Sequence, residues 1–195
     1  MSRDITMCHP RLQTLAQRLV TEGKKQGFII KIGECFRSVA EQDALYAQGR
    51  TNAGNIVTYA RGSSYSSMHQ WGVAFDVIRN DGKGAYNNND GWFDKVGKLG
   101  KSLGLEWGGD WTSPVDKPHF QLPDWGSTTA VLKRTYGNVD NFKKTWEVKK
   151  VIKTYDEAAK VLVEKGVIAS REYWDNAVKC VKYLDQLIIN MANKL

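Results

Sequence analysis

The chain has 195 residues and a mass of 22.0 kDa, which suits one domain, or one domain with a small appendage. Apolar residues make up 42% and charged residues 25%, which excludes a largely disordered chain, and no apolar stretch is long enough to span a membrane. Lys and Arg number 28 against 21 Asp and Glu, and the net charge of +7 favours a polyanionic partner, either nucleic acid or a cell-wall polymer.

A helix, a strand and a second helix are predicted at the start of the chain. Apolar residues recur at i, i+3 and i+4 spacing between His9 and Val20, which is typical of an amphipathic helix. The β-branched and aromatic run 28–36 then predicts a strand. Ser38 with Glu41 three residues later is a capping-box pattern, which predicts that a short helix begins there.

A second strand is predicted after a long polar loop, 50–67. Its side chains alternate, so that Val73, Phe75 and Val77 face one way. Asp76 faces the other way, together with small residues that leave space above the sheet for an ion and a substrate.

The middle of the chain predicts one more helix and two short strands. The helix runs from Trp92 and is closed by Gly104, and the strand candidates are 105–107 and 120–122. The elements do not follow the strand–helix–strand rhythm of a parallel sheet. We therefore predict an α+β fold, with a small antiparallel sheet and flanking helices.

The composition changes near Ser127, which predicts a body at 1–127 and a helical C-terminal region at 128–195. Two amphipathic helices, 146–165 and 173–191, predict a helical hairpin in this region. So short a segment does not bury a robust core alone. The hairpin is therefore expected to dock on the body, to bind the cell wall, or to form a homodimer.

Two of the three histidines stand in segments that indicate a metal site. His69 precedes the strand that carries Asp76, and His119 lies in another strand candidate. An acid buried in a strand is costly unless it is paired or bound to a metal. Two imidazoles and one carboxylate suit Zn²⁺ and leave a fourth position for water. Asp116, held near His119 by the stiff Pro118, is the candidate base for that water.

The same residues also have structural interpretations. A lone histidine on a strand is usually a hydrogen-bonded structural residue, Asp76 can pair with a Lys or Arg, and Asp116 can begin a turn. Spacing alone leaves these alternatives open, because no gapped metal motif such as H-E-x-x-H is present. Trp107 and Trp111 are expected to be structural, in a tight turn with core aromatic residues, and their alternative role is a wall of the substrate site.

The order of the motifs resembles the LAS zinc peptidases. Ser-x-His-x-x-Gly-x-Ala-x-Asp at 67–76 is followed by Asp-x-Pro-His-Phe at 116–120, with Phe-Arg-Ser at 36–38 and Trp-Gly-Gly-Asp-Trp at 107–111. The chain is most similar to the L-alanyl-D-glutamate endopeptidase and D-Ala-D-Ala carboxypeptidase (VanY-like) branch, which includes phage endolysins. The resemblance spans 9–123 and implies a LAS/hedgehog-like peptidase fold.

The resemblance also implies an activity and its site residues. It implies zinc on His69, Asp76 and His119, Asp116 as catalytic base, and substrate contacts by Arg37 and Ser67. The implied activity is hydrolysis of the peptidoglycan stem peptide, at the L-alanyl-D-glutamate bond. The alternatives are a D-Ala-D-Ala carboxypeptidase and, from another class, a non-catalytic cell-wall binding module.

The two predicted substrate contacts have alternatives as well. The guanidinium of Arg37 suits a bidentate contact with a peptide carboxylate, and its alternative is an exposed surface ion pair. Ser67 is otherwise a turn residue.

The remaining expectations concern partners and location. Nucleic acid is not expected as a partner, because the positive charge is dispersed and not interleaved with aromatic residues. Three widely spaced cysteines predict neither a disulfide framework nor a cysteine zinc site. No signal peptide is visible. The resemblance to endolysins implies a protein that is made in the host cytoplasm, does not insert into membranes, and acts on the bacterial cell wall.

Overall fold

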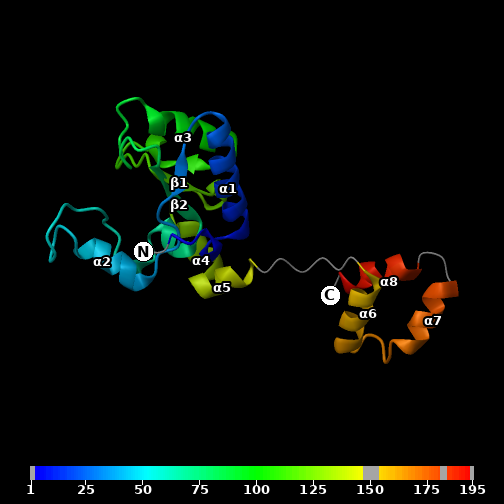
Figure 1. The fold of residues 1–195 in the computed structure, drawn as a ribbon. Coiled ribbons are helices and arrows are strands. Elements are labelled where there is room, and N and C mark those ends of the chain that lie inside the picture. The colour runs from blue at the N-terminus through cyan, green and yellow to red at the C-terminus, as the bar shows by residue number, and fades with distance from the viewer. Residues whose placement is uncertain (1–2, 147–153, 181–183, 194–195) are drawn as a thin grey trace. The chain divides into compact units, whose positions relative to one another are not determined.

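The computed structural model describes residues 3–146, 154–180 and 184–193. The chain divides into two compact units, Met1–Trp146 and Glu147–Leu195, which are called unit 1 and unit 2 here. Unit 1 is an α+β structure (Figure 1). It is built on a four-stranded antiparallel sheet, whose strands in spatial order are Ile30–Ile32, Ala74–Arg79, His119–Gln121 and Glu106–Trp107. The predicted fold class is therefore confirmed.

The elements of unit 1 are short. The strands are β1 (Ile30–Ile32), β2 (Ala74–Arg79), β3 (Glu106–Trp107) and β4 (His119–Gln121). The α-helices are α1 (Pro10–Lys25), α2 (Val39–Ala47), α3 (Trp92–Ser102), α4 (Ala130–Tyr136) and α5 (Val139–Lys144). A 3-10 helix, η3 (Met68–Trp71), leads into β2. The predicted capping box is present, because Ser38 Oγ accepts from the Glu41 amide at 3.2 Å while the Glu41 carboxylate accepts from the Ser38 amide.

The register of the sheet places four polar side chains on one face. Asp76 of β2 lies opposite His119 of β4, and Gln121 of β4 lies opposite Glu106 of β3. Residues that are directly opposed on neighbouring strands share a face, as do residues two apart on one strand. The alternation of the sheet therefore gathers these four side chains over its two central strands and β3.

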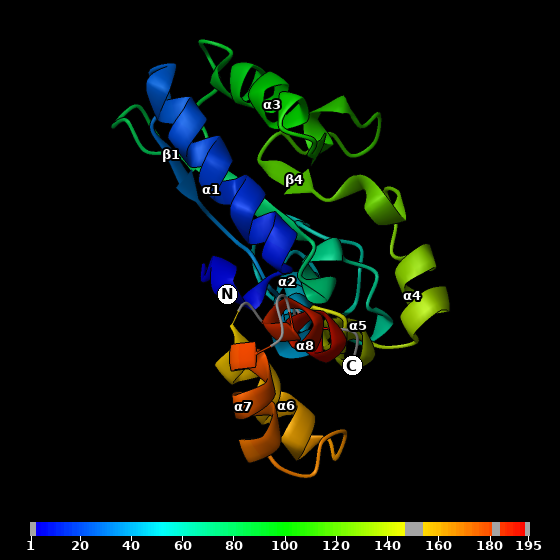
Figure 2. The same ribbon diagram turned by 90° about the vertical axis from the view of Figure 1, so that its right-hand side faces the viewer.

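The other face of the sheet is the core. Val73, Phe75 and Val77 are fully buried, as their alternation predicts. The helices α1 and α3 lie against this face (Figure 2), and α3 comes close because it presents glycine there. A Cβ added at Gly100 would lie 2.2 Å from the ring of Phe120, so a larger residue would push the helix off the sheet.

The first strand is shorter than the predicted run 28–36, because a β-bulge interrupts the pairing after Ile32. The amide of Gly33 donates to the Asp76 carbonyl at 2.7 Å, and the amide of Asp76 donates to the Glu34 carbonyl at 2.7 Å. Two residues thus oppose one, which bends the strand and changes the direction of the residues after it. The bulge turns the carbonyl of Cys35 toward His69.

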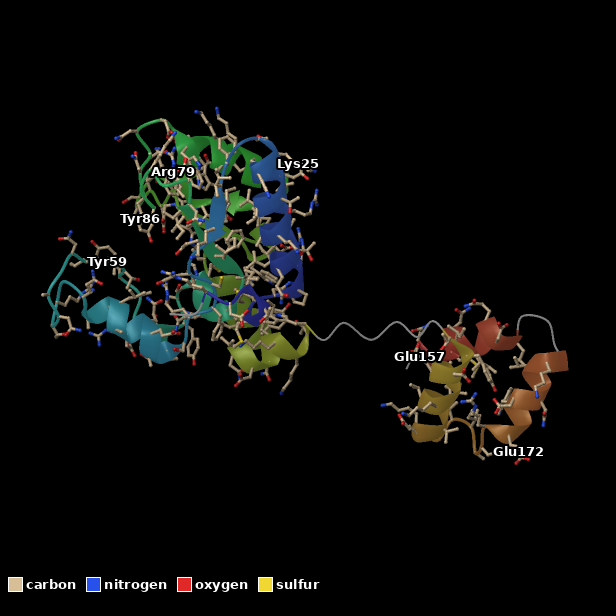
Figure 3. The ribbon with its side chains drawn as sticks, viewed as in Figure 1. Lys25, Tyr59, Arg79, Tyr86, Glu157 and Glu172 are labelled. Atoms are coloured by element: carbon tan, nitrogen blue, oxygen red, sulfur yellow. The ribbon has the colours of Figure 1, made fainter. Side chains whose placement is uncertain are left out.

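A buried arginine ties the loop after β2 to the sheet. Arg79, labelled in Figure 3, donates from Nη1 and Nη2 to the two carboxylate oxygens of Asp90, each at 2.7 Å, and from Nε to Asp81 at 2.8 Å. The guanidinium lowers the pKa of Asp90 to about 2 through its hydrogen bonds and its positive charge. These contacts hold the C-terminal end of β2, at Arg79, in place.

Two helices of unit 1 were not predicted, and they move the division between the units past Ser127 to Trp146. Leu132 of α4 and Phe142 of α5 are almost completely buried in the core of unit 1. Phe142 lies in an aromatic group in which the His9 ring is 5.9 Å from it and 5.5 Å from the Trp146 ring. The pattern missed both helices because each spans only about two turns.

Shortening the chain at these two positions is expected to have opposite results. Removal of residues 147–195 should leave unit 1 folded, because its core lies within the first unit. Removal of residues 128–195 also deletes Leu132 and Phe142, and the loss of one buried Phe side chain already costs about 3–5 kcal/mol. Urea unfolding of the two shortened proteins measures the difference, and equal stabilities would contradict this division.

Unit 2 is helical in its described residues, with α6 (Tyr155–Glu164), α7 (Glu172–Cys180) and α8 (Leu184–Ala192). Its core is a small set of aliphatic side chains from α6, α8 and the loop after α6: Ala158, Leu162, Ile168, Ile188, Ile189 and Ala192. The first predicted helix of the tail, 146–165, begins at Trp146, which is a turn residue of unit 1. It continues through 147–153, which lie outside the described part, and is observed as α6. The second predicted helix, 173–191, is divided by residues 181–183, which also lie outside the described part. None of the described helices has the length and apolar character needed to cross a membrane.

Candidate metal centre

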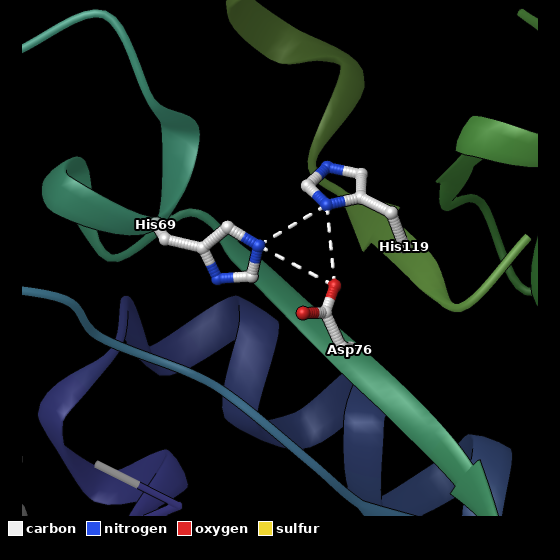
Figure 4. Close-up of side chains that lie close together, drawn as sticks. All are labelled: His69, Asp76 and His119. Atoms are coloured by element: carbon white, nitrogen blue, oxygen red, sulfur yellow. Dashed lines mark hydrogen bonds and ion pairs between the residues drawn. The ribbon is translucent and has the colours of Figure 1, made fainter. Parts of the chain in front are cut away.

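Three predicted ligands meet on the polar face of the sheet. His69 Nε2 lies 3.2 Å from His119 Nδ1, and Asp76 Oδ1 lies 3.4 Å from each of these nitrogens (Figure 4). His119 comes to this point by cross-strand pairing with Asp76, and His69 comes from η3, which ends at Gly72 with a positive φ of 67°. The structure thus brings together side chains that are far apart in the sequence.

The outer nitrogen of each ring faces a hydrogen-bond acceptor. His69 Nδ1 lies 2.8 Å from the Cys35 carbonyl, which can only accept. His119 Nε2 lies 3.0 Å from Gln121 Oε1, and the amide group of Gln121 donates instead to Glu106. The single proton of each neutral ring therefore sits on the outer nitrogen, and each inner nitrogen carries a lone pair.

The arrangement fits a bound cation. Two lone pairs and one carboxylate oxygen point at a common position, with no hydrogen-bond donor among them, and their atoms lie within 4.8 Å of one another. Asp76 Oδ1 is buried and makes no hydrogen bond within the described residues. Burial raises the pKa of Asp76, but the two neighbouring rings of His69 and His119 outweigh this effect and hold the pKa below its usual range. Two imidazoles and one carboxylate are a common ligand set for zinc.

The apparent zinc affinity is expected to fall on acidification, beginning above pH 6.5. Burial opposes a charge on His119, but Asp76 outweighs this effect and raises the pKa of the ring above its usual 6.5. A nitrogen that binds a metal must be unprotonated, so the metal competes with the proton on His119 once the pH falls below the raised pKa of this ring. Below that pKa, the apparent zinc affinity should fall about tenfold for each pH unit. Competition with a chelator between about pH 8 and about pH 6 measures this, and an unchanged affinity would contradict it.

Asp116 lies at the edge of the same centre. Its amide donates to the Gly108 carbonyl at 2.9 Å, and its carbonyl accepts from the His119 amide at 3.2 Å, which fixes the backbone next to the ligand. Burial raises the pKa of Asp116, the charge of Asp76 adds to the rise, and His119, His69 and Arg37 act against it. A carboxyl group with a raised pKa is suited to accept a proton and to return it.

Arg37 is largely buried rather than part of an exposed surface pair. Its Nη1 donates to Gln42 Oε1 at 2.9 Å, and its Nη2 forms an ion pair with the Glu34 carboxylate. Its Nε is buried and makes no hydrogen bond within the described residues. The backbone amide of Arg37 donates to the His69 carbonyl at 3.2 Å, which places the residue next to a ligand, and its positive charge acts to lower the pKa of Asp116.

Ser67 occupies the position just before η3, two residues from His69. Its side chain makes no capping hydrogen bond, and its carbonyl accepts from the Gln70 amide at 3.0 Å. Ser67 is thus near His69 in the sequence, and its substrate role stays a prediction.

Several residues near the centre were not predicted. Gln121 and the Cys35 carbonyl hold the outer nitrogens of the ligands. Trp107 is structural, as expected, with its indole donating to the Lys117 carbonyl at 2.7 Å. Trp111, which was given the same role, lies with its ring 4.9 Å from the His119 ring. The i, i+2 spacing of His119 and Gln121 in a strand is the signal that would have found Gln121.

Comparison with known proteins finds peptidases that are similar to this chain. A peptidase M15-type family model, described as D-alanyl-D-alanine carboxypeptidase, matches residues 61–122. The peptidoglycan L-alanyl-D-glutamate endopeptidase CwlK of Bacillus subtilis (strain 168) is 41% identical over 124 residues, which are 58% of this chain and 72% of CwlK. The L-alanyl-D-glutamate peptidase of Listeria phage A118 is 34% identical over 111 residues, which are 55% of this chain and 35% of the phage protein.

Two solved structures are also similar. The L-Ala D-Glu endopeptidase ChiX of Serratia marcescens has 21% identity and a TM-score of 0.46, over 60% of this chain and 82% of ChiX. The vancomycin-resistance D,D-pentapeptidase VanY, a mutant solved with Zn(II), has 15% identity and a TM-score of 0.44, over 70% of this chain and 76% of that chain.

The fold and the site define a peptidase of the metal-dependent class. The similarity to CwlK, most of whose length this chain covers, decides the family: the chain belongs to the M15 peptidases and is an enzyme. The resemblance predicted from the sequence is confirmed, and the alternative of a non-catalytic binding module is set aside.

Proposed function

We propose that this enzyme is a zinc-dependent peptidoglycan hydrolase that cleaves the stem peptide between L-alanine and D-glutamate. The observation that carries the proposal is the convergence of two imidazole lone pairs with Oδ1 of Asp76, which makes no hydrogen bond within the described residues. The relatives named for L-alanyl-D-glutamate cleavage support the choice of bond.

The roles of the residues are assigned from their positions. His69, Asp76 and His119 would hold zinc, which when bound supplies a Lewis acid and lowers the pKa of a water molecule toward neutrality. Asp116 accepts a proton from the attacking water and delivers it to the nitrogen of the leaving amine. Its raised pKa favours this shuttle, because a more basic carboxylate takes the proton more readily.

Substrate binding is assigned to Arg37 and Ser67. The substrate carries carboxylate groups, and the buried Nε of Arg37 is a donor without a hydrogen bond within the described residues. A substrate carboxylate bound beside the guanidinium would gain a charge-assisted interaction with it. Ser67, two residues before His69, is assigned to binding of the peptide backbone through its hydroxyl.

Mass spectrometry of digested muropeptides tests the proposed bond. An L-alanyl-D-glutamate endopeptidase leaves L-alanine as the last residue on the glycan and releases a peptide that begins with D-glutamate. A D-Ala-D-Ala carboxypeptidase, the activity in the description of the family model, instead shortens stem peptides by one terminal alanine. The second pattern alone would overturn the proposed bond and leave the metal centre in place.

Unit 2 is assigned to binding of the cell wall, and this assignment is part of the same proposal. The enzyme would be made in a host cytoplasm and would act on the wall, as its likeness to a phage peptidase suggests. A protein of residues 1–146 should then keep its rate on soluble muropeptides but lose sedimentation with intact walls. Unchanged sedimentation would reject wall binding, and a dimer confined to the full chain would favour the dimerisation alternative.

A further inference from the structure

We propose that Gln121, held in place by Glu106, is a positioning residue that fixes the proton of His119 and thereby strengthens zinc binding. The proposal rests on the metal centre described above. It concerns residues that touch neither the metal nor the substrate.

The contacts around His119 form a closed chain. His119 Nε2 lies 3.0 Å from Gln121 Oε1, and Gln121 Nε2 donates to Glu106 Oε2 at 3.2 Å. The other carboxylate oxygen of Glu106 accepts from the Trp111 indole at 3.0 Å, and the Trp111 ring lies 4.9 Å from the His119 ring. This series of contacts therefore begins and ends at His119.

The orientation of the Gln121 amide is determined by its other partners. Gln121 is fully buried, and its amide nitrogen donates to Glu106 and, at 3.3 Å, to the Gly126 carbonyl. Both partners are acceptors, so reversing the amide would place two acceptors against its oxygen and leave its hydrogens unsatisfied. The amide oxygen is therefore the atom that faces His119.

This orientation decides where the ring carries its proton. Because Gln121 Oε1 accepts from Nε2, the neutral ring presents a lone pair at Nδ1, toward Asp76 and His69. Without that acceptor, the proton is free to move to Nδ1, where Asp76 Oδ1 lies 3.4 Å away. A metal would then have to displace this proton before it could bind Nδ1. Gln121 removes this competition by keeping the proton on Nε2.

Replacement of the amide tests the proposal through zinc affinity. Gln121→Met keeps the length of the side chain and removes the acceptor, and we expect zinc affinity, measured by chelator competition, to fall about 10–100-fold. A variant that binds zinc as tightly as the unmodified protein would overturn the proposal.

Exchange of donor and acceptor separates positioning from packing. Gln121→Glu alone removes the donor to Glu106 and sets two carboxylates side by side, which repel each other or share a proton. The acceptor at position 121 is then no longer held toward His119, and zinc binding should also weaken. The double variant Gln121→Glu with Glu106→Gln restores an acceptor for His119, a donor between the two positions and the total charge. It should recover most of the affinity lost in Gln121→Glu. No recovery would show that position 121 serves only packing, which contradicts the proposal.

A measurement on the unaltered protein keeps the proposal testable if these variants do not fold. In the metal-free protein, at a pH where the ring is neutral, the imidazole ¹⁵N shifts should show His119 protonated at Nε2. They should show His69 protonated at Nδ1, because its partner is the Cys35 carbonyl. Protonation of His119 at Nδ1 would overturn the proposal whether or not the enzyme cleaves the proposed bond.

Discussion

Replacement of His119 with alanine is expected to abolish zinc binding and to lower the rate of hydrolysis at least about 10³-fold. The change removes one of only two imidazole ligands and leaves Asp76 Oδ1 beside a single ring. A catalytic metal contributes several kcal/mol to the stability of the transition state, and each 1.36 kcal/mol is tenfold in rate. Metal analysis and muropeptide release, measured on the same preparation, report the two losses together.

His9 provides a matched control for this substitution. It is the one histidine outside the centre, and its Nδ1 accepts from the Arg11 amide at 3.2 Å at the start of α1. His9→Asn keeps a residue type that caps helices well, so zinc content and rate should be unchanged. If His119→Ala, with an unaltered circular dichroism spectrum, kept its zinc and its rate, the assignment of the metal centre would be wrong.

The convergence of the three ligands was predictable because the alternation of β2 is legible in the sequence. Val73, Phe75 and Val77 form the buried side, which forces Asp76 to the opposite face. An acid on that face, preceded by one histidine and followed much later by another, indicates a site. The sequence did not determine which strand pairs with β2, so the approach of His119 rested on the family resemblance.

The contacts that hold the ligands could not be predicted, because they depend on backbone geometry. The bulge at Gly33 and Glu34 aims the Cys35 carbonyl at His69, and no side-chain pattern reports a carbonyl direction. The amide orientation of Gln121 likewise depends on Glu106, which reaches it only through the pairing of β3 with β4.

Arg37 illustrates how burial changes an interpretation. Its sequence context allowed an exposed ion pair or a substrate contact, and the structure shows a largely buried guanidinium between Glu34 and Gln42. Gln42 in turn donates to the Ala60 carbonyl at 2.9 Å and so connects Arg37 with the long loop. The long-range partner at Ala60 is invisible to any local pattern.

Replacement of Asp116 with asparagine is expected to remove activity without removing zinc. Asp116 is not among the three residues whose ligand atoms converge, so metal analysis should give the same zinc content as the unmodified enzyme. An amide cannot accept and return the proton, and loss of a general base typically costs about 10²–10⁴-fold in rate. The combination of full zinc content and lost turnover distinguishes a base from a ligand.

Asp110 supplies the comparison that makes this result specific. It lies six residues before Asp116 in the sequence, its side chain is 51% exposed, and it pairs with Lys101 on the surface. Asp110→Asn makes the same chemical change, yet it should keep the rate, because surface ion pairs contribute little and this carboxylate faces solvent. If both variants lost activity to the same extent, the loss would reflect the negative charge of this part of the chain and not a specific role of Asp116. If the rate of Asp116→Asn stayed within about tenfold of the unmodified rate, the loss would be smaller than removal of a general base causes. Another group would then carry out the proton transfer.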